Sequence, residues 1–238
     1  MAWCAYCSRS SFIARTASCI TTLIIASRVI VSNPSRILWL GIYFGVLIWS
    51  AIAPKDGFTW LLEVAPALIG FAVLAATYRR FPLTPLAYWL VLIHSVILMV
   101  GGHYTYAEVP LFDWLREWLH WQRNNYDKVG HLAQGFIPAI LAREILLRLH
   151  VVRGRGWLVF VVVSFCLAVS ALYEILEWWV AVASGDAGVA FLATQGYEWD
   201  TQSDMALAGL GAVLALGALS KLHDRQLAIG DSRAMATK

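Results

Sequence analysis

The stretch Tyr126-Asp-Lys-Val-Gly-His-Leu-Ala-Gln-Gly-Phe136 opens an apolar segment with an acid, a base and an imidazole. An ordinary membrane segment carries none of these groups, because charged side chains are costly in lipid. If the stretch is helical, Asp127, His131 and Gln134 lie on one stripe, since side chains three and four residues apart share a face. This stripe needs polar partners from elsewhere in the chain.

Two later stretches offer such partners. Ser170-Ala-Leu-Tyr-Glu-Ile-Leu-Glu177 carries Glu174 and Glu177 on one face of a helix, and Asp200-Thr-Gln-Ser-Asp204 places two acids one helical turn apart. We therefore expect these three segments to converge on one polar site.

The composition is that of a membrane protein. Hydrophobic residues make up 60% of the chain and charged residues 14%, compared with roughly 25% charged in an average soluble domain. The formal net charge is only +3 and no long basic run occurs, which argues against nucleic acid as a partner. The lipid bilayer is the expected partner instead.

Six apolar runs have about the length of a membrane-spanning helix. They lie at residues 37–53, 58–77, 86–102, 129–147, 157–183 and 203–222. The pattern predicts an all-α polytopic membrane bundle of about six transmembrane helices. Residues 1–36 are expected to form a poorly ordered or surface-lying extension, 37–225 the six-span domain and 226–238 a cytoplasmic tail.

The basic residues predict the orientation, because loops on the cytoplasmic side are rich in Lys and Arg. With the N-terminus inside, fourteen of the eighteen Lys and Arg residues lie on the cytoplasmic side, and twelve of the fifteen acids near the other side. This favours a bacterial inner-membrane protein with both termini in the cytoplasm and an outward-facing polar site.

The connection at residues 103–126 contains a patterned segment. Leu111, Leu115, Trp118 and Leu119 recur at helical spacing, and Trp114 and Trp121 are of a type common at membrane interfaces. This favours an amphipathic helix on the outer membrane surface. The alternative is a soluble loop with incidental tryptophans.

The depth of the acids makes a function plausible. Glu174 lies seventeen residues after Trp157, or about 25 Å along a helix, in a hydrocarbon layer about 30 Å thick. A carboxylate inside the membrane is costly unless it is paired, protonated or bound to a cation. The sequence therefore indicates a functional site.

Carboxylates with one imidazole suit a divalent metal such as Zn, Mn or Fe. The candidate metal ligands are Asp127, His131, Glu174, Glu177, Asp200 and Asp204. The first four of these are also the candidates for catalytic acid–base work. Several alternatives stay open: a structural hydrogen-bonded network, helix N-capping by Asp127, Asp200 or Ser203, neutralisation of one carboxylate by Lys128 or Arg123, and a proton or ion relay.

Other polar residues are candidates for binding a substrate. They are His103, Tyr106, Arg123, Lys128 and Gln202. His103 and Tyr106 follow the third apolar run and could cover the site, and Arg123 could hold an anionic headgroup or phosphate. Glu63, near the outer end of the second run, could join the site or extend toward the interface.

Four motifs resemble those of the YjdF-like inner-membrane proteins, a bacterial family without an assigned biochemical function. They are Gly101–Tyr106, Arg123–His131, Tyr173–Trp179 and Gln195–Met205. A looser resemblance is to VanZ-like membrane proteins, which share an Asp-Lys-x-x-His helix start, a Glu-x-x-polar pair and an Asp opening the final span. The residues that carry this second resemblance are Asp127, Lys128, His131, Glu174, Glu177 and Asp204. Both resemblances imply a helical cell-envelope protein, and neither supplies a reaction.

The sequence thus leaves three function hypotheses. The first is metal-dependent or acid–base action on a lipid-linked or envelope substrate. The second is a proton- or ion-coupled transporter, although no inverted repeat of broken helices is evident. The third is a non-catalytic membrane protein in which the polar groups are structural.

Overall fold

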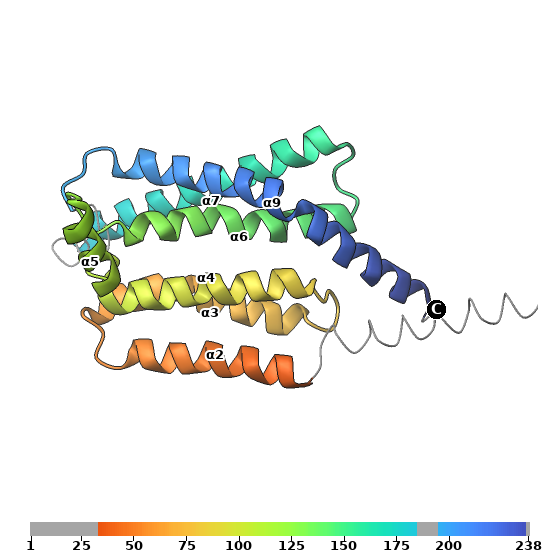
Figure 1. Cartoon of the computed structure of the whole chain (residues 1–238), viewed down its shortest axis with the longest axis horizontal. Coiled ribbons are helices and arrows are strands. Elements are labelled where there is room, and N and C mark those ends of the chain that lie inside the picture. Colours follow the sequence, from red (N-terminus) through yellow and green to blue (C-terminus); the bar gives the residue numbers. More distant parts are fainter. Residues whose placement is uncertain (1–32, 185–194, 237–238) are drawn as a thin grey trace, which may run out of the picture. The chain divides into compact units, whose positions relative to one another are not determined.

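A computed structural model describes residues 33–184 and 195–236, and the predicted N-terminal extension lies almost wholly outside this part. The described residues form helices and no strand (Figure 1). The helices are α2 (Asn33–Ala51), α3 (Gly57–Thr77), α4 (Pro85–Tyr104), α5 (Pro110–Leu119), α6 (Tyr126–Arg148), α7 (Arg155–Ser184) and α9 (Asp200–Ala236). Contacts divide the chain after Ile42, and all the packing described below lies within residues 43–238.

Five helices of the described chain are long and apolar enough to cross a membrane. The candidate spans are Pro34–Ala51, Gly57–Thr77, Pro85–Tyr104, Arg155–Ser184 and Asp200–Ile229. The sixth long helix, α6, is less apolar because it carries buried Asp127, His131, Arg143 and Glu144. It packs against α4, α7 and α9, so neighbouring helices cover its polar groups (Figure 1). The predicted all-helical membrane bundle is confirmed.

Local signals fix the helix boundaries. The Asp56 carboxylate accepts a hydrogen bond of 2.6 Å from the Thr59 N–H and so caps the N-terminus of α3. This hydrogen bond stabilises the charged carboxylate and lowers the pKa of Asp56. At α4, Thr84 is the N-cap residue and Pro85 occupies the first turn, where its missing N–H costs nothing.

Glycines bring the backbones of α6 and α9 into contact. A Cβ added at Gly135 would lie 1.8 Å from the carbonyl oxygen of Ala208, and one at Gly211 would lie 2.2 Å from that of Leu132. Neither position has room for a side chain. The sequence places small residues on this face of α9, and the structure shows why: α6 and α9 approach each other more closely than larger residues allow.

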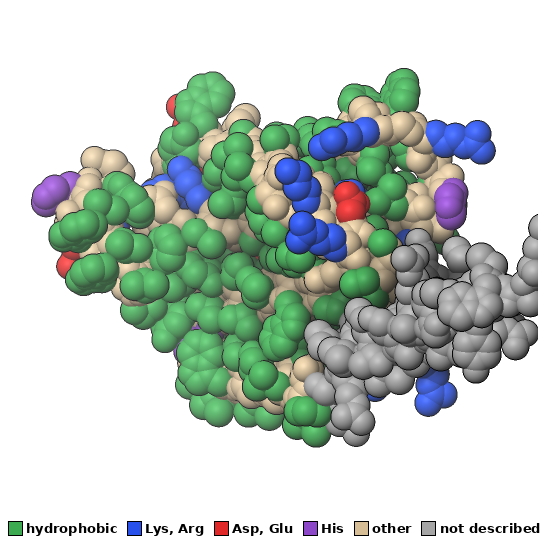
Figure 2. All heavy atoms as spheres, turned by 45° about the vertical axis from the view of Figure 1, so that its right-hand side comes forward, with side chains coloured by type: hydrophobic (Ala, Val, Ile, Leu, Met, Phe, Trp, Pro, Cys, Tyr) green, Lys and Arg blue, Asp and Glu red, His purple; other side chains and the backbone are tan. Residues whose placement is uncertain are grey.

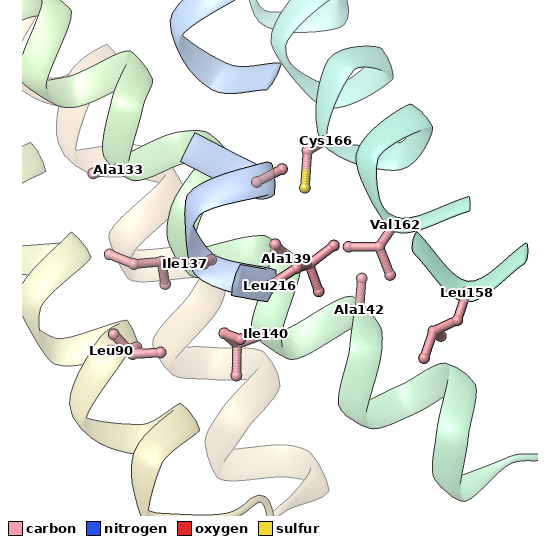
Figure 3. Packing of buried hydrophobic residues seen from close by; sticks show 12 residues of the cluster. Leu90, Ala133, Ile137, Ala139, Ile140, Ala142, Leu158, Val162, Cys166 and Leu216 are labelled. Atoms are coloured by element: carbon pink, nitrogen blue, oxygen red, sulfur yellow. The ribbon is translucent and has the colours of Figure 1, made fainter. Parts of the chain in front are cut away.

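Next to this contact, mostly farther along α6, lies the apolar core that joins α4, α6, α7 and α9. Figure 3 shows Ile137, Ala139 and Ile140 of α6 among side chains of the neighbouring helices. Cys166 is fully buried, and its thiol lies 3.5 Å from the Gly135 carbonyl oxygen, to which it donates. This core holds α6 in a fixed register against its neighbours.

The exterior is apolar, as expected for a surface in contact with lipid. Figure 2 shows hydrophobic side chains over most of the described part of one face. On α5, the apolar residues are also exposed, among them Leu111, Trp114 and Trp118. The segment is a helix rather than a loop, and its exposed apolar side chains suit a membrane interface.

Candidate functional site

Six carboxylates are buried near one end of the bundle. They are Glu63 on α3, Asp127 on α6, Glu174 and Glu177 on α7, and Asp200 and Asp204 on α9. Each is at most 9% exposed. The helix periodicity explains the pattern within α7 and α9, because residues three or four apart share a face. The three stretches singled out in the sequence therefore converge, and α3 adds a fourth contributor.

His131 lies at the centre of this cluster. Its Nε2 is 3.4 Å from Asp127 Oδ1 and 3.7 Å from Glu174 Oε1. Its Nδ1 is 3.0 Å from Gln134 Oε1, which accepts a hydrogen bond. The Nδ1 atom then carries a proton, and Nε2 presents either a second proton or a lone pair to the carboxylates. A lone pair facing carboxylate oxygens is unfavourable unless a proton or a metal cation lies between them.

Asp127, His131 and Asp204 meet the spacing of a metal site. One potential ligand atom from each lies within 4.8 Å of the other two. Asp204 Oδ1 and Glu174 Oε1 are buried and accept no hydrogen bond from the described residues. Ser170, one turn before Glu174, also has a buried hydroxyl without such a partner. Buried polar atoms are normally satisfied, so these atoms keep hydrogen-bonding or coordinating capacity that a ligand could use.

Arg123 is a cation within the cluster. Its guanidinium donates to Asp200 and lies 3.5 Å from Asp127 Oδ2. It thereby ties the segment before α6 to the first turn of α9. Asn125, not Asp127, is the N-cap residue of α6, so the capping explanation for Asp127 is wrong. Asp127 lies instead in the first turn, where the helix dipole favours an acid.

Glu63 belongs to the cluster, which the sequence left open. Its Oε2 accepts a hydrogen bond of 3.1 Å from the hydroxyl of Tyr173. Glu63 also interacts electrostatically with Asp127 and His131, and Glu177 interacts with Glu63 and Glu174. Tyr173 was missed by sequence reasoning. The signal was its position directly before Glu174, but a buried tyrosine in a membrane helix does not by itself point to a site.

Tyr106 lies against the cluster in a slot made by two glycines. A Cβ at Gly101 would be 2.1 Å from the Tyr106 ring, and one at Gly130 would be 2.9 Å from it. Tyr106 adopts the left-handed backbone conformation, with φ of 55°. Burial, with a smaller contribution from the Glu63 charge, raises the pKa of its hydroxyl, which therefore stays protonated at neutral pH.

The other substrate-binding candidates lie farther out. The Lys128 ammonium lies 4.9 Å from the centre of the Tyr197 ring, and the Arg123 guanidinium 5.5 Å from it. Gln202 is exposed on the first turn of α9. His103 is turned toward α2, where its Nδ1 is 3.0 Å from the Ser50 carbonyl oxygen. The His103 ring therefore lies against Ser50 and Trp49 of α2 and makes no described contact with the acids.

Comparison with known proteins agrees with this architecture. Residues 35–225 match the family described as predicted membrane protein (DUF2238). The chain belongs to this family. It is 52% identical over 182 residues to inner membrane protein YjdF of Escherichia coli (strain K12), covering 76% of this chain and 87% of that one. No solved structure matches the chain. The resemblance to YjdF-like inner-membrane proteins is thus confirmed, and the membrane bundle is the fold of a family member.

A second buried polar network lies at the opposite end of α6, and sequence reasoning missed it. Glu144 is fully buried and accepts hydrogen bonds from the Thr84 N–H (2.9 Å), the Thr84 hydroxyl (2.7 Å) and Arg148 (3.0 Å). His223 Nε2 lies 3.1 Å from Glu144, and His223 Nδ1 lies 3.0 Å from Arg143. Since Arg143 can only donate, His223 donates to Glu144 through Nε2.

The two networks differ in how well their atoms are satisfied. Both oxygens of Glu144 have several partners, and its charge is balanced by that of Arg148. Atoms of Asp204 and Glu174 lack hydrogen-bond partners among the described residues, and six carboxylates face at most two cations, Arg123 and a protonated His131. The Glu144 network is typical of a structural clamp, and the cluster around His131 is typical of a ligand-binding site.

Proposed function

We propose that the cluster binds a divalent transition metal through Asp127, His131 and Asp204 and acts on a lipid-linked or envelope substrate. The excess of buried negative charge carries this proposal. Six buried carboxylates cannot all stay ionised in a membrane beside one arginine and one histidine, because each uncompensated charge costs several kcal/mol. A divalent cation supplies the missing positive charge.

The geometry of His131 supports a metal rather than protons alone. Two ligands about 2.1 Å from a tetrahedral zinc ion lie about 3.4 Å apart. The distance from His131 Nε2 to Asp127 Oδ1 is 3.4 Å, which is longer than an ordinary hydrogen bond. The Nδ1 contact with Gln134 also fits, because metal-bound histidines normally donate their other N–H to an oxygen.

Glu174 and Glu177 are then the proposed acid–base groups, and Asp200 supports the site through Arg123. A divalent cation in such a place polarises a phosphoryl or carbonyl oxygen of a substrate. Arg123, Lys128 and Tyr106 are the proposed donors to a substrate. Their charge and protonation suit a phosphate or another anionic group.

The surroundings support a substrate from the membrane interface. Hydrogen bonds tie α5 to the segment that precedes α6. The Asn124 side-chain amide donates to the carbonyl oxygen of Val109, just before α5 (3.0 Å), and to Asp113 Oδ1 within α5 (3.1 Å). The exposed tryptophans of α5 suit the headgroup region. With both termini in the cytoplasm, as the distribution of basic residues favours, this headgroup region is that of the outer leaflet.

The test is metal content by mass spectrometry on detergent-purified protein that has met no chelator. We expect nearly one transition-metal ion per wild-type chain and at least tenfold less in His131→Ala and Asp204→Asn, each still folded by size exclusion. His103→Ala and Glu117→Gln are the controls, since His103 contacts α2 and Glu117 is exposed on α5. Wild-type protein without metal would refute the proposal.

A proton- or ion-coupled transporter is the second candidate. The hydrogen bond from Tyr173 to Glu63 favours it, because it links a carboxylate of α3 to the acids of α7 and gives protons a chain of acceptors. Two results together would favour this function over the first: wild-type protein contains no metal, and its pH-driven flux in reconstituted vesicles is reduced by Glu63→Gln.

A further inference from the structure

A cavity of about 490 Å³ lies between α3, α4 and α6, apart from the polar cluster. Ligand pockets in proteins usually have volumes of about 300–1,000 Å³. Most of the lining side chains are apolar, among them Val73, Leu74, Val91, Leu98, Leu141 and Ile145. Gly70 also lines it, and a Cβ added there would meet no atom within 4 Å.

The cavity is as long as one leaflet of a membrane. Along α3 it extends from Pro66 to Thr77, eleven residues or about 17 Å, and along α6 from Ile137 to Leu149, about 18 Å. Half of a hydrocarbon core about 30 Å thick is about 15 Å. The length therefore fits an acyl chain that enters from one membrane surface and ends near the midplane.

The polar groups in the wall are few. The Thr77 hydroxyl donates to the Val73 carbonyl oxygen (2.7 Å), and the Ser95 hydroxyl to that of Val91 (2.9 Å). Both hydroxyls are thus satisfied by their own helices. His94 is the remaining polar side chain in the wall, so the wall as a whole suits a hydrocarbon chain rather than a polar molecule.

Basic residues lie next to one end of the cavity. Thr77 and Phe81 line it there, and the exposed residues Arg79 and Arg80 lie in the turn between them. Arg148 stacks on the Phe81 ring at 3.8 Å from its centre and donates to the Pro82 carbonyl oxygen. A phosphate at this end of an acyl chain would meet arginine side chains.

We propose that this cavity binds an anionic phospholipid, with one acyl chain between α3, α4 and α6 and its phosphate at Arg79 and Arg80. The lipid belongs to the leaflet that borders the turn at residues 78–84. That leaflet is the cytoplasmic one in the orientation given above. The site is separate from the cluster around His131 and does not depend on the function of that cluster.

Native mass spectrometry of the full chain in detergent tests the proposal, with phosphatidylglycerol and phosphatidylcholine of identical acyl chains as probes. We expect wild-type protein to retain phosphatidylglycerol in preference to phosphatidylcholine. Replacing both Arg79 and Arg80 by glutamine should reduce this preference about 25-fold, since each arginine near an anionic lipid contributes about fivefold. Lys221→Gln with Arg225→Gln, an exposed basic pair on α9, should leave it unchanged.

A second variant tests the acyl chain. Gly70→Leu fills the cavity without a clash at the Cβ, so it should reduce retention of both lipids at least tenfold. Gly217→Leu is the matched control, because this α9 glycine also has open space and does not line the cavity. Equal retention of the two lipids by wild type, retention of detergent only, or unchanged retention in Gly70→Leu would each overturn the proposal.

Discussion

Replacing Gly135 by alanine tests whether the contact between α6 and α9 sets the geometry of the polar cluster. The new Cβ would lie 1.8 Å from the Ala208 carbonyl oxygen, and real Cβ atoms essentially never come within 3.0 Å of such an atom. The two backbones must therefore move apart by at least 1.2 Å, the difference between these distances. The obstacle is backbone, so no side-chain rotation relieves it.

This movement reaches the proposed metal ligands directly. Gly135 lies one turn after His131, and Ala208 one turn after Asp204. A shift of about 1 Å exceeds the roughly 0.2 Å by which metal–ligand distances vary. We expect Gly135→Ala to lose at least tenfold in bound metal, and its free energy of unfolding to fall by about 1–3 kcal/mol because of overpacking.

Metal content and thermal unfolding in detergent measure the two effects. Gly217→Ala is the control, because a Cβ there meets nothing within 4 Å and alanine improves helix propensity by about 1 kcal/mol. Gly135→Ala protein with the metal content and stability of Gly217→Ala would refute the reasoning. Normal metal content with lowered stability would show that the contact supports the fold but not the site.

Three further outcomes are expected. Glu144→Ala should lower the free energy of unfolding by about 3–5 kcal/mol, because it leaves the buried polar partners of Glu144 without a carboxylate. In the same denaturation assay, the control Glu117→Ala at an exposed position should change this free energy by less than about 0.5 kcal/mol. Asp56→Ala should cost about 1 kcal/mol at neutral pH through loss of the α3 cap. Because the pKa of Asp56 is lowered in the folded state, the stabilisation by the cap is present above the unfolded pKa of about 3.9 and is lost as the pH falls through the folded pKa. If the difference in melting temperature between wild type and Asp56→Ala did not change with pH, this prediction would be contradicted. A C-terminal green fluorescent protein fusion should fluoresce and a C-terminal alkaline phosphatase fusion should be inactive, and the reverse pair of results would invert the proposed orientation.

Much of the candidate site could be predicted from the sequence, because charged residues in apolar helices are rare and costly. Asp127, Glu174 and Asp204 could be selected on this ground alone. Glu63 could not, since it lies near the end of a span, where a carboxylate can also reach the interface. The contacts of His103 could not be predicted either, because they depend on how α4 packs against α2, not on its position in the chain.

The sequence by itself determined the helices, because apolar runs of membrane length and turn residues between them are local properties. It also determined which helices carry acids. Only the tertiary structure decided that Asp204 lies beside His131, that Glu144 is fully satisfied, and that an apolar cavity remains between α3, α4 and α6. These features depend on the distance and rotation between helices. Backbone contacts such as that of Gly135 with Ala208 set both, and no local pattern encodes which two helices meet.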